Sequence, residues 1–271
     1  MKKLIMTALT GLVLVAMATP VLALGPVDVN AELGLHSKYV WRGMVTTPDM
    51  VLQPAVDVNL FGLTAGFWGN MDTNDVNEQK SEFNEIDWTL GYEMNLPFLN
   101  FGTGFIHYRF PNSMNPLDGT PIATPSTTEL YLHASANVIL SPSLTFYQDI
   151  DEIKGGYWEA SVSHGLPLSP VANLDMEAGL GLGSKGYIEG YFGEHTILPA
   201  VPEVPGNASL TDAYLTASMP YSLALFFTIT PSVTYTTLMS DVKDIVDLAD
   251  GEAYHGESDA FFWSLTGTFT F

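Results

Sequence analysis

Apolar and polar residues alternate along most of this chain with a period of two, the spacing typical of β-strands. The last segment shows the pattern most clearly. Aromatic, apolar or glycine residues occupy every second position from Trp263 to Phe271, and Ser264 and three threonines fill the positions between them. A strand with one apolar face and one face of small polar side chains, ending on Phe, is typical of a closed barrel in a bacterial outer membrane.

The same alternation predicts about twelve strands, with ten or fourteen left open. Most have close to the ~9–11 residues that a tilted strand needs to cross a membrane. No helical periodicity continues beyond the N-terminal segment. The predicted strands span residues 30–43, 51–60, 62–72, 83–94, 100–110, 128–140, 143–151, 156–165, 173–184, 209–219, 222–238 and 258–271.

The connections between these strands alternate between short and long. The short ones lie at 59–62, 95–100, 140–143, 165–173 and 219–222, and most of those between them are longer and more polar. Short periplasmic turns and long external loops are expected of bacterial barrels. The sequence therefore predicts an all-β fold, a transmembrane antiparallel up-and-down β-barrel of outer-membrane type, formed as one domain by residues 24–271.

The N-terminal segment has the features of a secretory signal. Lys2 and Lys3 precede an apolar stretch that runs to about Ala18, and small or branched residues follow as far as Ala23. We expect residues 1–23 to be cleaved as a signal peptide. With the terminal Phe271, which barrel-assembly machinery would read, this places the protein in the outer membrane of a Gram-negative bacterium, in contact with lipid and lipopolysaccharide.

Composition narrows the function classes. Hydrophobic residues make up 46% of the chain and charged residues only 14%, so the chain folds rather than remaining disordered. The absence of Cys excludes disulfides and thiolate metal sites. With 30 acidic and 9 basic residues the net charge is −21, which argues against nucleic acid as a partner. The acidity either keeps exposed loops solvated or creates a field that attracts cations.

Strand parity assigns charged side chains to the interior, because a Lys or Arg facing lipid at mid-depth costs about 2–4 kcal/mol. The predicted register puts Arg109 beside Glu85 and His107 beside Asp87. These residues form either a constriction that orients a small polar solute or an ion-pair network that plugs a narrow barrel. The candidate pore-lining residues are Lys38, Arg42, Asp57, Glu85, Asp87, Glu93, His107, Arg109, Glu129, Tyr131, Tyr147, Asp149 and Glu159.

Several short motifs carry a family resemblance. They are Ser37–Met44 (SKYVWRGM), Gln53-Pro54, Gly66–Asn70, Glu85–Trp88, Gly91-Tyr92, His107–Pro111 and Thr128–Tyr131. Together they resemble the TorF-family porins, most clearly in the first 150 residues. The resemblance implies an outer-membrane barrel with a channel role and no catalytic activity, and it implies no particular substrate.

Other motifs carry less weight. After the glycine pattern from Gly181 to Gly186 we expect a strand end and a loop, not the helix that a dinucleotide site needs, so no cofactor is expected. Asp241, Asp244, Asp247 and Asp250 crowd one external loop and form a weak candidate for Ca²⁺, although their spacing is not that of an EF-hand. A solvated acidic loop is the alternative. No other metal site is expected.

The predicted function is therefore a non-enzymatic porin for passive diffusion of small hydrophilic solutes, with cations or neutral solutes preferred. A narrow plugged barrel with a structural or adhesive role is the alternative. An outer-membrane hydrolase is a third reading, although Ser163 and His164 are adjacent and so face opposite sides of a strand. The sequence leaves open whether the protein is a monomer or a homo-oligomer.

Overall fold

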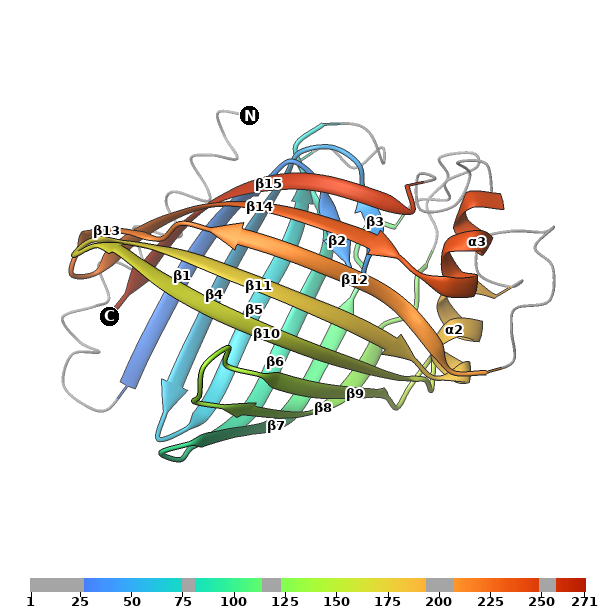
Figure 1. The fold of residues 1–271 in the computed structure, drawn as a ribbon. Helices are drawn as coiled ribbons and strands as arrows, with labels where there is room; N and C mark the ends of the chain where they lie inside the picture. The colour runs from blue at the N-terminus through green and yellow to red at the C-terminus, as the bar shows by residue number, and fades with distance from the viewer. Residues whose placement is uncertain (1–26, 75–80, 114–122, 194–206, 249–256) are drawn as a thin grey trace.

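Twelve antiparallel strands form a closed barrel in the computed structural model, which describes residues 27–74, 81–113, 123–193, 207–248 and 257–271. Each strand pairs with its neighbours in the sequence, and β1 pairs with β15 to complete the wall (Figure 1). The wall strands are β1 (Val27–His36), β4 (Val51–Leu60), β5 (Leu63–Asp72), β6 (Phe83–Asn95), β7 (Leu99–Arg109), β8 (Thr127–Ala136), β9 (Ser143–Asp149), β10 (Gly156–Ser169), β11 (Ala172–Gly183), β12 (Ser209–Ser218), β14 (Phe227–Leu238) and β15 (Asp259–Thr270).

The alternation in the sequence corresponds to the two faces of this wall. On β6, Trp88, Leu90 and Tyr92 are 53%, 47% and 47% exposed, whereas Glu85 on the opposite parity is buried. Large apolar side chains therefore cover the outside of the barrel, and polar ones face its interior. The prediction of a twelve-strand up-and-down barrel of outer-membrane type is confirmed.

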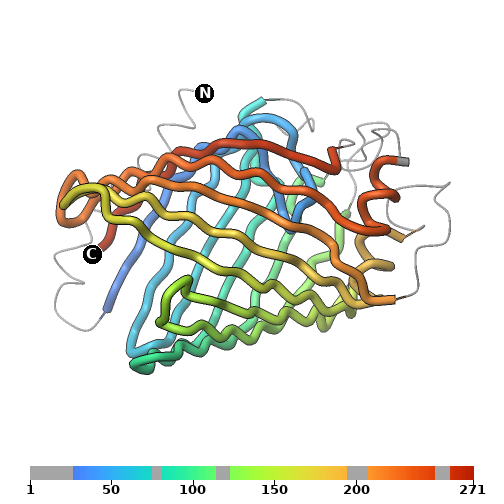
Figure 2. Tube along the Cα trace, in the orientation of Figure 1, coloured from blue at the N-terminus to red at the C-terminus, as the bar shows by residue number. Residues whose placement is uncertain are grey.

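The long connections gather at one end of the barrel and the short turns at the other (Figure 2). The C-terminus lies at the short-turn end, where Phe271 exchanges backbone hydrogen bonds with Val29. The short strand β13 (Tyr221–Ala224) extends the β12–β14 connection at this end and pairs with β11 and β14. The predicted signal peptide, residues 1–23, lies outside the described residues.

The first predicted strand, 30–43, is wrong in its second half. The wall strand β1 ends at His36, and the chain then forms a separate hairpin of β2 (Tyr39–Trp41) and β3 (Met44–Thr47). Arg42 and Gly43 have φ values of +47° and +80°, which is the requirement of a two-residue type I′ turn. This turn is encoded locally by the Arg-Gly pair.

Two short helices at the long-loop end also depart from the prediction, which contained no helix after the N-terminal segment. They are α2 (Lys185–Phe192) and α3 (Ser240–Leu248). Each covers only about two turns, so its apolar residues are too few to stand out from the surrounding loop. Within the residues described, neither helix has the length and apolarity needed to span a membrane.

Candidate functional site

The interior of the barrel is the candidate site, and the β2–β3 hairpin divides it. Tyr39 packs against Trp68 on the inner face of β5, with ring centroids 5.5 Å apart. At the other end of the hairpin, a Cβ atom built on Gly43 would lie 2.6 Å from the Cβ of Asp212 on β12. The hairpin therefore crosses the lumen from one side of the wall to the other. Its tip fits only because residue 43 has no side chain.

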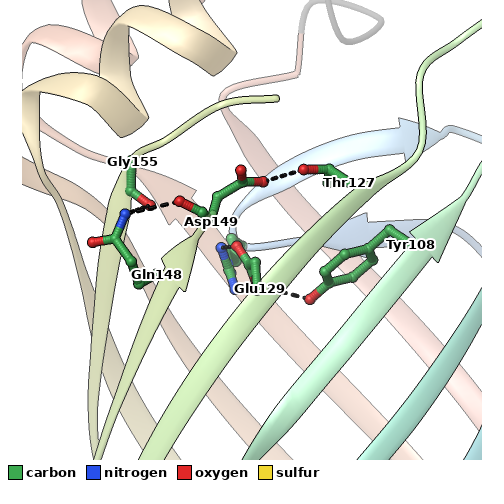
Figure 3. Close-up of polar contacts among 7 residues, drawn as sticks. Tyr108, Thr127, Glu129, Gln148, Asp149 and Gly155 are labelled. Carbon is green, nitrogen blue, oxygen red and sulfur yellow. Dashed lines mark hydrogen bonds and ion pairs between the residues drawn. The ribbon is translucent and has the colours of Figure 1, made fainter. Parts of the chain in front are cut away.

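Arg42, at the tip of the hairpin, is held by an ion pair with the wall. Its two terminal nitrogens donate to the two carboxylate oxygens of Glu129 on β8, at 2.9 and 2.7 Å. The side chains of Arg42 and Glu129 are only 7% and 2% exposed. The hydroxyl of Tyr108 also donates to Glu129, at 2.8 Å (Figure 3). A two-pronged contact of this kind fixes both position and orientation.

Aromatic rings enclose the same guanidinium group. Its carbon lies 4.4 Å from the ring centroid of Trp41, 4.5 Å from that of Tyr147 and 4.3 Å from that of Tyr157. Cation–π contacts contribute most where water is excluded, as it is here. Arg42 is thus a structural clamp between the hairpin and the strands β8, β9 and β10.

An apolar cluster covers the hairpin at the long-loop end. Met44 from the hairpin packs with Ile188 of α2, with Val242, Ile245 and Val246 of α3, and with Leu238 of β14. Tyr187 belongs to the same cluster, and burial raises the pKa of its hydroxyl well above the usual range. The two helices therefore close over the hairpin and give this half of the barrel a core of its own.

Two buried carboxylates on the inner face accept hydrogen bonds from other groups of the protein. The hydroxyl of Tyr157 donates to Asp212 at 3.0 Å. The side chain of Asp149 accepts from Thr127 at 2.5 Å (Figure 3). It also accepts from the backbone N–H groups of residues 151, 153 and 154. Asp149, which the sequence suggested as a pore-lining residue, therefore organises the β9–β10 turn.

We expect Asp149→Ala to destabilise the barrel by about 2–3 kcal/mol or more, because several buried donors lose a charged acceptor. Asp151→Ala is the matched control, since Asp151 is exposed and only its backbone N–H takes part in this network. Urea unfolding in detergent micelles, followed by tryptophan fluorescence, gives the two free energies of unfolding. Equal values for the two variants would contradict this role for Asp149.

The other half of the lumen, toward the short turns, is lined by hydroxyl groups and carboxylates. Thr and Ser residues of β14 and β15 alternate inward, as in the pair Ser232 and Ser264. Asp57 lies within electrostatic range of Glu32 and Glu93. None of the ion pairs formed by the described residues includes these three carboxylates. This half therefore carries an uncompensated negative charge.

The structure places most of the predicted pore-lining residues on the inner face, as their parity required. The carboxylates fall into two groups, those near the hairpin and those in the polar half. The residues on inward positions are Asp57, Glu85, Asp87, Glu93, Glu129, Tyr131, Tyr147, Asp149 and Glu159. Their placement is geometric and leaves any role in transport to be tested.

The prediction was wrong for Arg109 and His107. Arg109 pairs with Ile86, and Asp87 pairs with Tyr108, so the register differs by one residue from the predicted one. A one-residue slip moves every side chain of a strand to the opposite face. Phe101 and Phe105 share the parity of Arg109 and are exposed on the outer surface. Arg109 ends its strand, where a charge does not meet the cost expected at mid-depth.

Lys38 and Arg42 lie inside the barrel, but not on the wall strand where the sequence placed them. Lys38 occupies the bend between β1 and β2 and forms an ion pair with Glu257, which precedes β15. Tyr39 and Trp41, which parity on a continuous strand would have turned toward lipid, also lie in the lumen. The positions of all four residues differ from the predicted ones because the chain leaves the wall after His36.

The tyrosines of the inner wall lie flat against glycines. A Cβ atom on Gly91 would lie 2.1 Å from the hydroxyl of Tyr131, and one on Gly179 would lie 2.4 Å from the ring of Tyr214. The alternating glycines of β11 thus make room for aromatic side chains. Tyr131 and Tyr147, both predicted here, are 6.4 Å apart between ring centroids.

The acidic segment proposed as a weak Ca²⁺ candidate is largely helical. Asp241, Asp244 and Asp247 lie on the exposed face of α3, and Asp250 lies outside the described residues. Lys243 of this helix donates to Asp259 at 2.5 Å, and this hydrogen bond raises the pKa of Lys243. No cluster of three potential metal ligands occurs within the described parts of the chain.

Sequence reasoning missed the residues that surround Arg42. Tyr157 and Tyr187 were not singled out, although both contact the guanidinium group, and Glu257 was not recognised as the partner of Lys38. The inward parity of Tyr157 could have been read from Glu159, two residues further along β10. Tyr187 and Glu257 lie in long connections, where the sequence carries no periodic signal.

Solved structures of three outer-membrane proteins align with this chain over most of its length. The KdgM porin in complex with disordered oligogalacturonate aligns at 9% identity with a TM-score of 0.51, covering 90% of this chain and 99% of that one. The NanC porin aligns at 11% identity over 89% and 98% of the two chains, with a TM-score of 0.48. An outer membrane channel from Pseudomonas putida F1 aligns at 11% identity over 90% and 94%, with a TM-score of 0.47.

At such low identity these likenesses concern the fold alone. No curated protein sequence is significantly similar to the chain. The family model named Gcw_chp, described as a bacterial protein of unknown function, matches residues 21–186 and so covers more than half of the sequence, including the hairpin and its clamp. This chain therefore belongs to the Gcw_chp family of bacterial proteins.

Proposed function

We propose that this protein is an outer-membrane channel for the passive diffusion of small hydrophilic solutes, with cations and neutral solutes favoured over anions. The observation that carries the proposal is the hydroxyl- and carboxylate-lined half of the lumen, which would hold water. Glu32, Asp57 and Glu93 lie there without a cationic partner among the described residues. The likeness of the motifs around Tyr39–Gly43 to TorF-family porins also supports a channel role.

The hairpin would be the constriction of this channel. It narrows the lumen in the long-loop half, where Arg42, Glu129 and the aromatic rings are packed together. The acidic interior suggests a solute class different from that in the KdgM complex, whose oligogalacturonate is a chain of acidic sugars. A negative lumen would repel such a polyanion. We propose no chemical step, so the role is that of a conduit.

Neutralising the polar half should reduce cation preference. We expect the double variant Glu32→Gln, Asp57→Asn to shift the reversal potential in a KCl gradient toward zero, because two inward charges are removed. The gradient should centre on ~0.1 M salt, where the Debye length is about 10 Å. Planar-bilayer recordings of the refolded protein give the reversal potential.

Arg109→Ala is the control for this measurement. Because Arg109 lies on the outer face at the end of β7, we expect its removal to leave selectivity unchanged. A wild-type channel that prefers anions would overturn the proposed selectivity. So would a double variant whose reversal potential equals that of the wild type.

A plugged barrel with a structural or adhesive role is the second candidate, and the same hairpin favours it. The clamp at Arg42 and the apolar cluster of α2 and α3 would both hold a plug in place. Wild-type conductance separates the two candidates. Discrete current steps from the folded, heat-modifiable protein support the channel, and silence from the same preparation supports the plug.

A hydrolase is less well supported. Ser163 faces the lumen and His164 faces outward, so they do not form a nucleophile–base pair. Among the described residues, His107 and His133 have hydrogen-bond partners, which are Thr128 and Thr145. Neither contact provides the serine and carboxylate of a triad.

A further inference from the structure

A cavity of about 370 Å³ lies in the lumen between the hairpin and the wall strands β1, β4–β7 and β15. Its volume falls within the range of small-molecule sites. Five Phe, Tyr and Trp side chains contribute to its lining, two from the hairpin and three from the wall. They are Tyr39, Trp41, Trp68, Tyr108 and Phe262. The acidic side chain in this lining is Asp87 of β6.

One oxygen of Asp87 is shielded from solvent and receives no hydrogen bond from the residues described. Several of the donors around it are engaged elsewhere. The side chain of Tyr39 forms a hydrogen bond with Glu85, and Tyr108 donates to Glu129 at 2.8 Å. Lys38 is paired with Glu257, and Gln53 donates to Asn70 at 2.9 Å. Four donors of the lining are thus engaged, and none of the other described residues, His36 and Thr89 included, donates to this oxygen.

A buried carboxylate without a donor is unfavourable as a bare anion, so it takes up a proton or a bound cation. Aromatic faces attract cations by their quadrupole, most strongly where water is excluded. The nearby Lys and Arg side chains do not compensate Asp87, because Arg42 and Lys38 each have their own carboxylate partner. Glu85, two residues away on the same face, adds to the negative field. An anionic ligand is disfavoured for the same reason.

We propose that this cavity binds a small organic cation, a primary ammonium or guanidinium group on a short carbon skeleton. The cationic head would donate to Asp87, and the carbon skeleton would pack against Trp41 and Trp68. The proposal rests on the proposed channel function only in that the solute must reach the lumen. It goes further by naming one site and one ligand class.

The test uses the purified full-length protein in detergent micelles and three probes of matched size: butylammonium, butanol and butyrate. Binding is followed by titration calorimetry and by tryptophan fluorescence, which Trp41 and Trp68 should report. We expect saturable binding of butylammonium to one site per barrel, and binding at least about tenfold weaker for the other two probes. Butanol binding as tightly as butylammonium would overturn the assignment of a cation site.

Asp87→Asn keeps the shape of the side chain and removes its charge, and we expect it to weaken butylammonium binding at least about tenfold. Trp68→Leu is a second variant, which should weaken binding by removing one aromatic wall. Asp57→Asn is the control, because Asp57 is an inward carboxylate that does not line the cavity. Heat-modifiability on gels verifies that each variant is folded. Unchanged affinity in folded Asp87→Asn would overturn the proposal.

Binding and conduction fail independently in this design. Saturable binding by a barrel that carries no current would support the cation-binding site and contradict the channel function. Current steps from a barrel that binds none of the probes would support the channel function and contradict the cation-binding site.

Discussion

Arg42→Ala should destabilise the protein by about 3–5 kcal/mol, the cost of leaving one partner of a buried ion pair without the other. The side chain of Glu129 is 2% exposed in the wild type, and among the described residues its remaining donor would be the hydroxyl of Tyr108. The contacts with Trp41, Tyr147 and Tyr157 would be lost together with the ion pair. We expect the hairpin to leave the wall and single-channel conductance to rise. Urea unfolding and planar-bilayer recordings measure the two effects.

Two further variants show whether the effect belongs to the clamp. Lys185→Ala breaks an ion pair whose side chains are 57% and 51% exposed, so it should cost no more than about 1 kcal/mol and leave conductance unchanged. Arg42→Met combined with Glu129→Gln removes both charges and should recover much of the stability, since apolar replacement of a buried pair is often neutral. If Arg42→Ala matched the wild type in both measurements, the clamp would have no role.

Gly43→Val should release the hairpin tip by a different route. At a φ of +80°, a β-branched residue is strained by about 1–3 kcal/mol. Its Cβ atom would also lie 2.6 Å from the Cβ of Asp212 and 2.9 Å from a methyl group of Leu238. Because both neighbours belong to the wall, the tip has to move into the lumen. We expect a change in single-channel conductance, with the circular dichroism of a folded barrel retained.

Gly62→Val is the matched control for this variant. Gly62 has a φ of +87° and an equally close neighbour, the backbone oxygen of Glu93 at 2.4 Å, but it lies in the short turn between β4 and β5. Both substitutions should lower stability, and only the one at position 43 should alter conductance. Identical currents for the two folded variants would show that the hairpin tip does not limit the channel.

Taken together, the variants at Arg42 and Gly43 also test the plugged-barrel reading. A wild type that is silent and becomes conducting only in these variants would identify the hairpin as a plug. A wild type that conducts, with larger steps in the variants, would identify it as a constriction. The distinction matters for the proposed cation site, because the hairpin forms one wall of that cavity.

The sequence alone determined the barrel fold and the alternation of short and long connections, and it predicted about twelve strands. These properties depend on local information, since each strand must turn apolar side chains outward and polar ones inward, and this requirement leaves a period of two. The inward placement of Asp57, Glu85, Asp87 and Glu129 followed from the same parity. On β7, Phe101 and Phe105 indicated the correct register, because both are exposed on the outer face. The prediction instead placed Arg109 inside because of its charge, and so chose the wrong register.

Only the tertiary structure decided how the lumen is filled. The sequence of the hairpin alternates well enough to continue a wall strand, and nothing local distinguishes an inward fold from an extended one except the Arg-Gly turn. The partners that draw it inward are distant in the chain: Glu129 is 87 residues from Arg42, and Glu257 is 219 residues from Lys38. Pairings over such separations depend on closure of the barrel, because only the closed wall brings β8, β12 and the hairpin into contact.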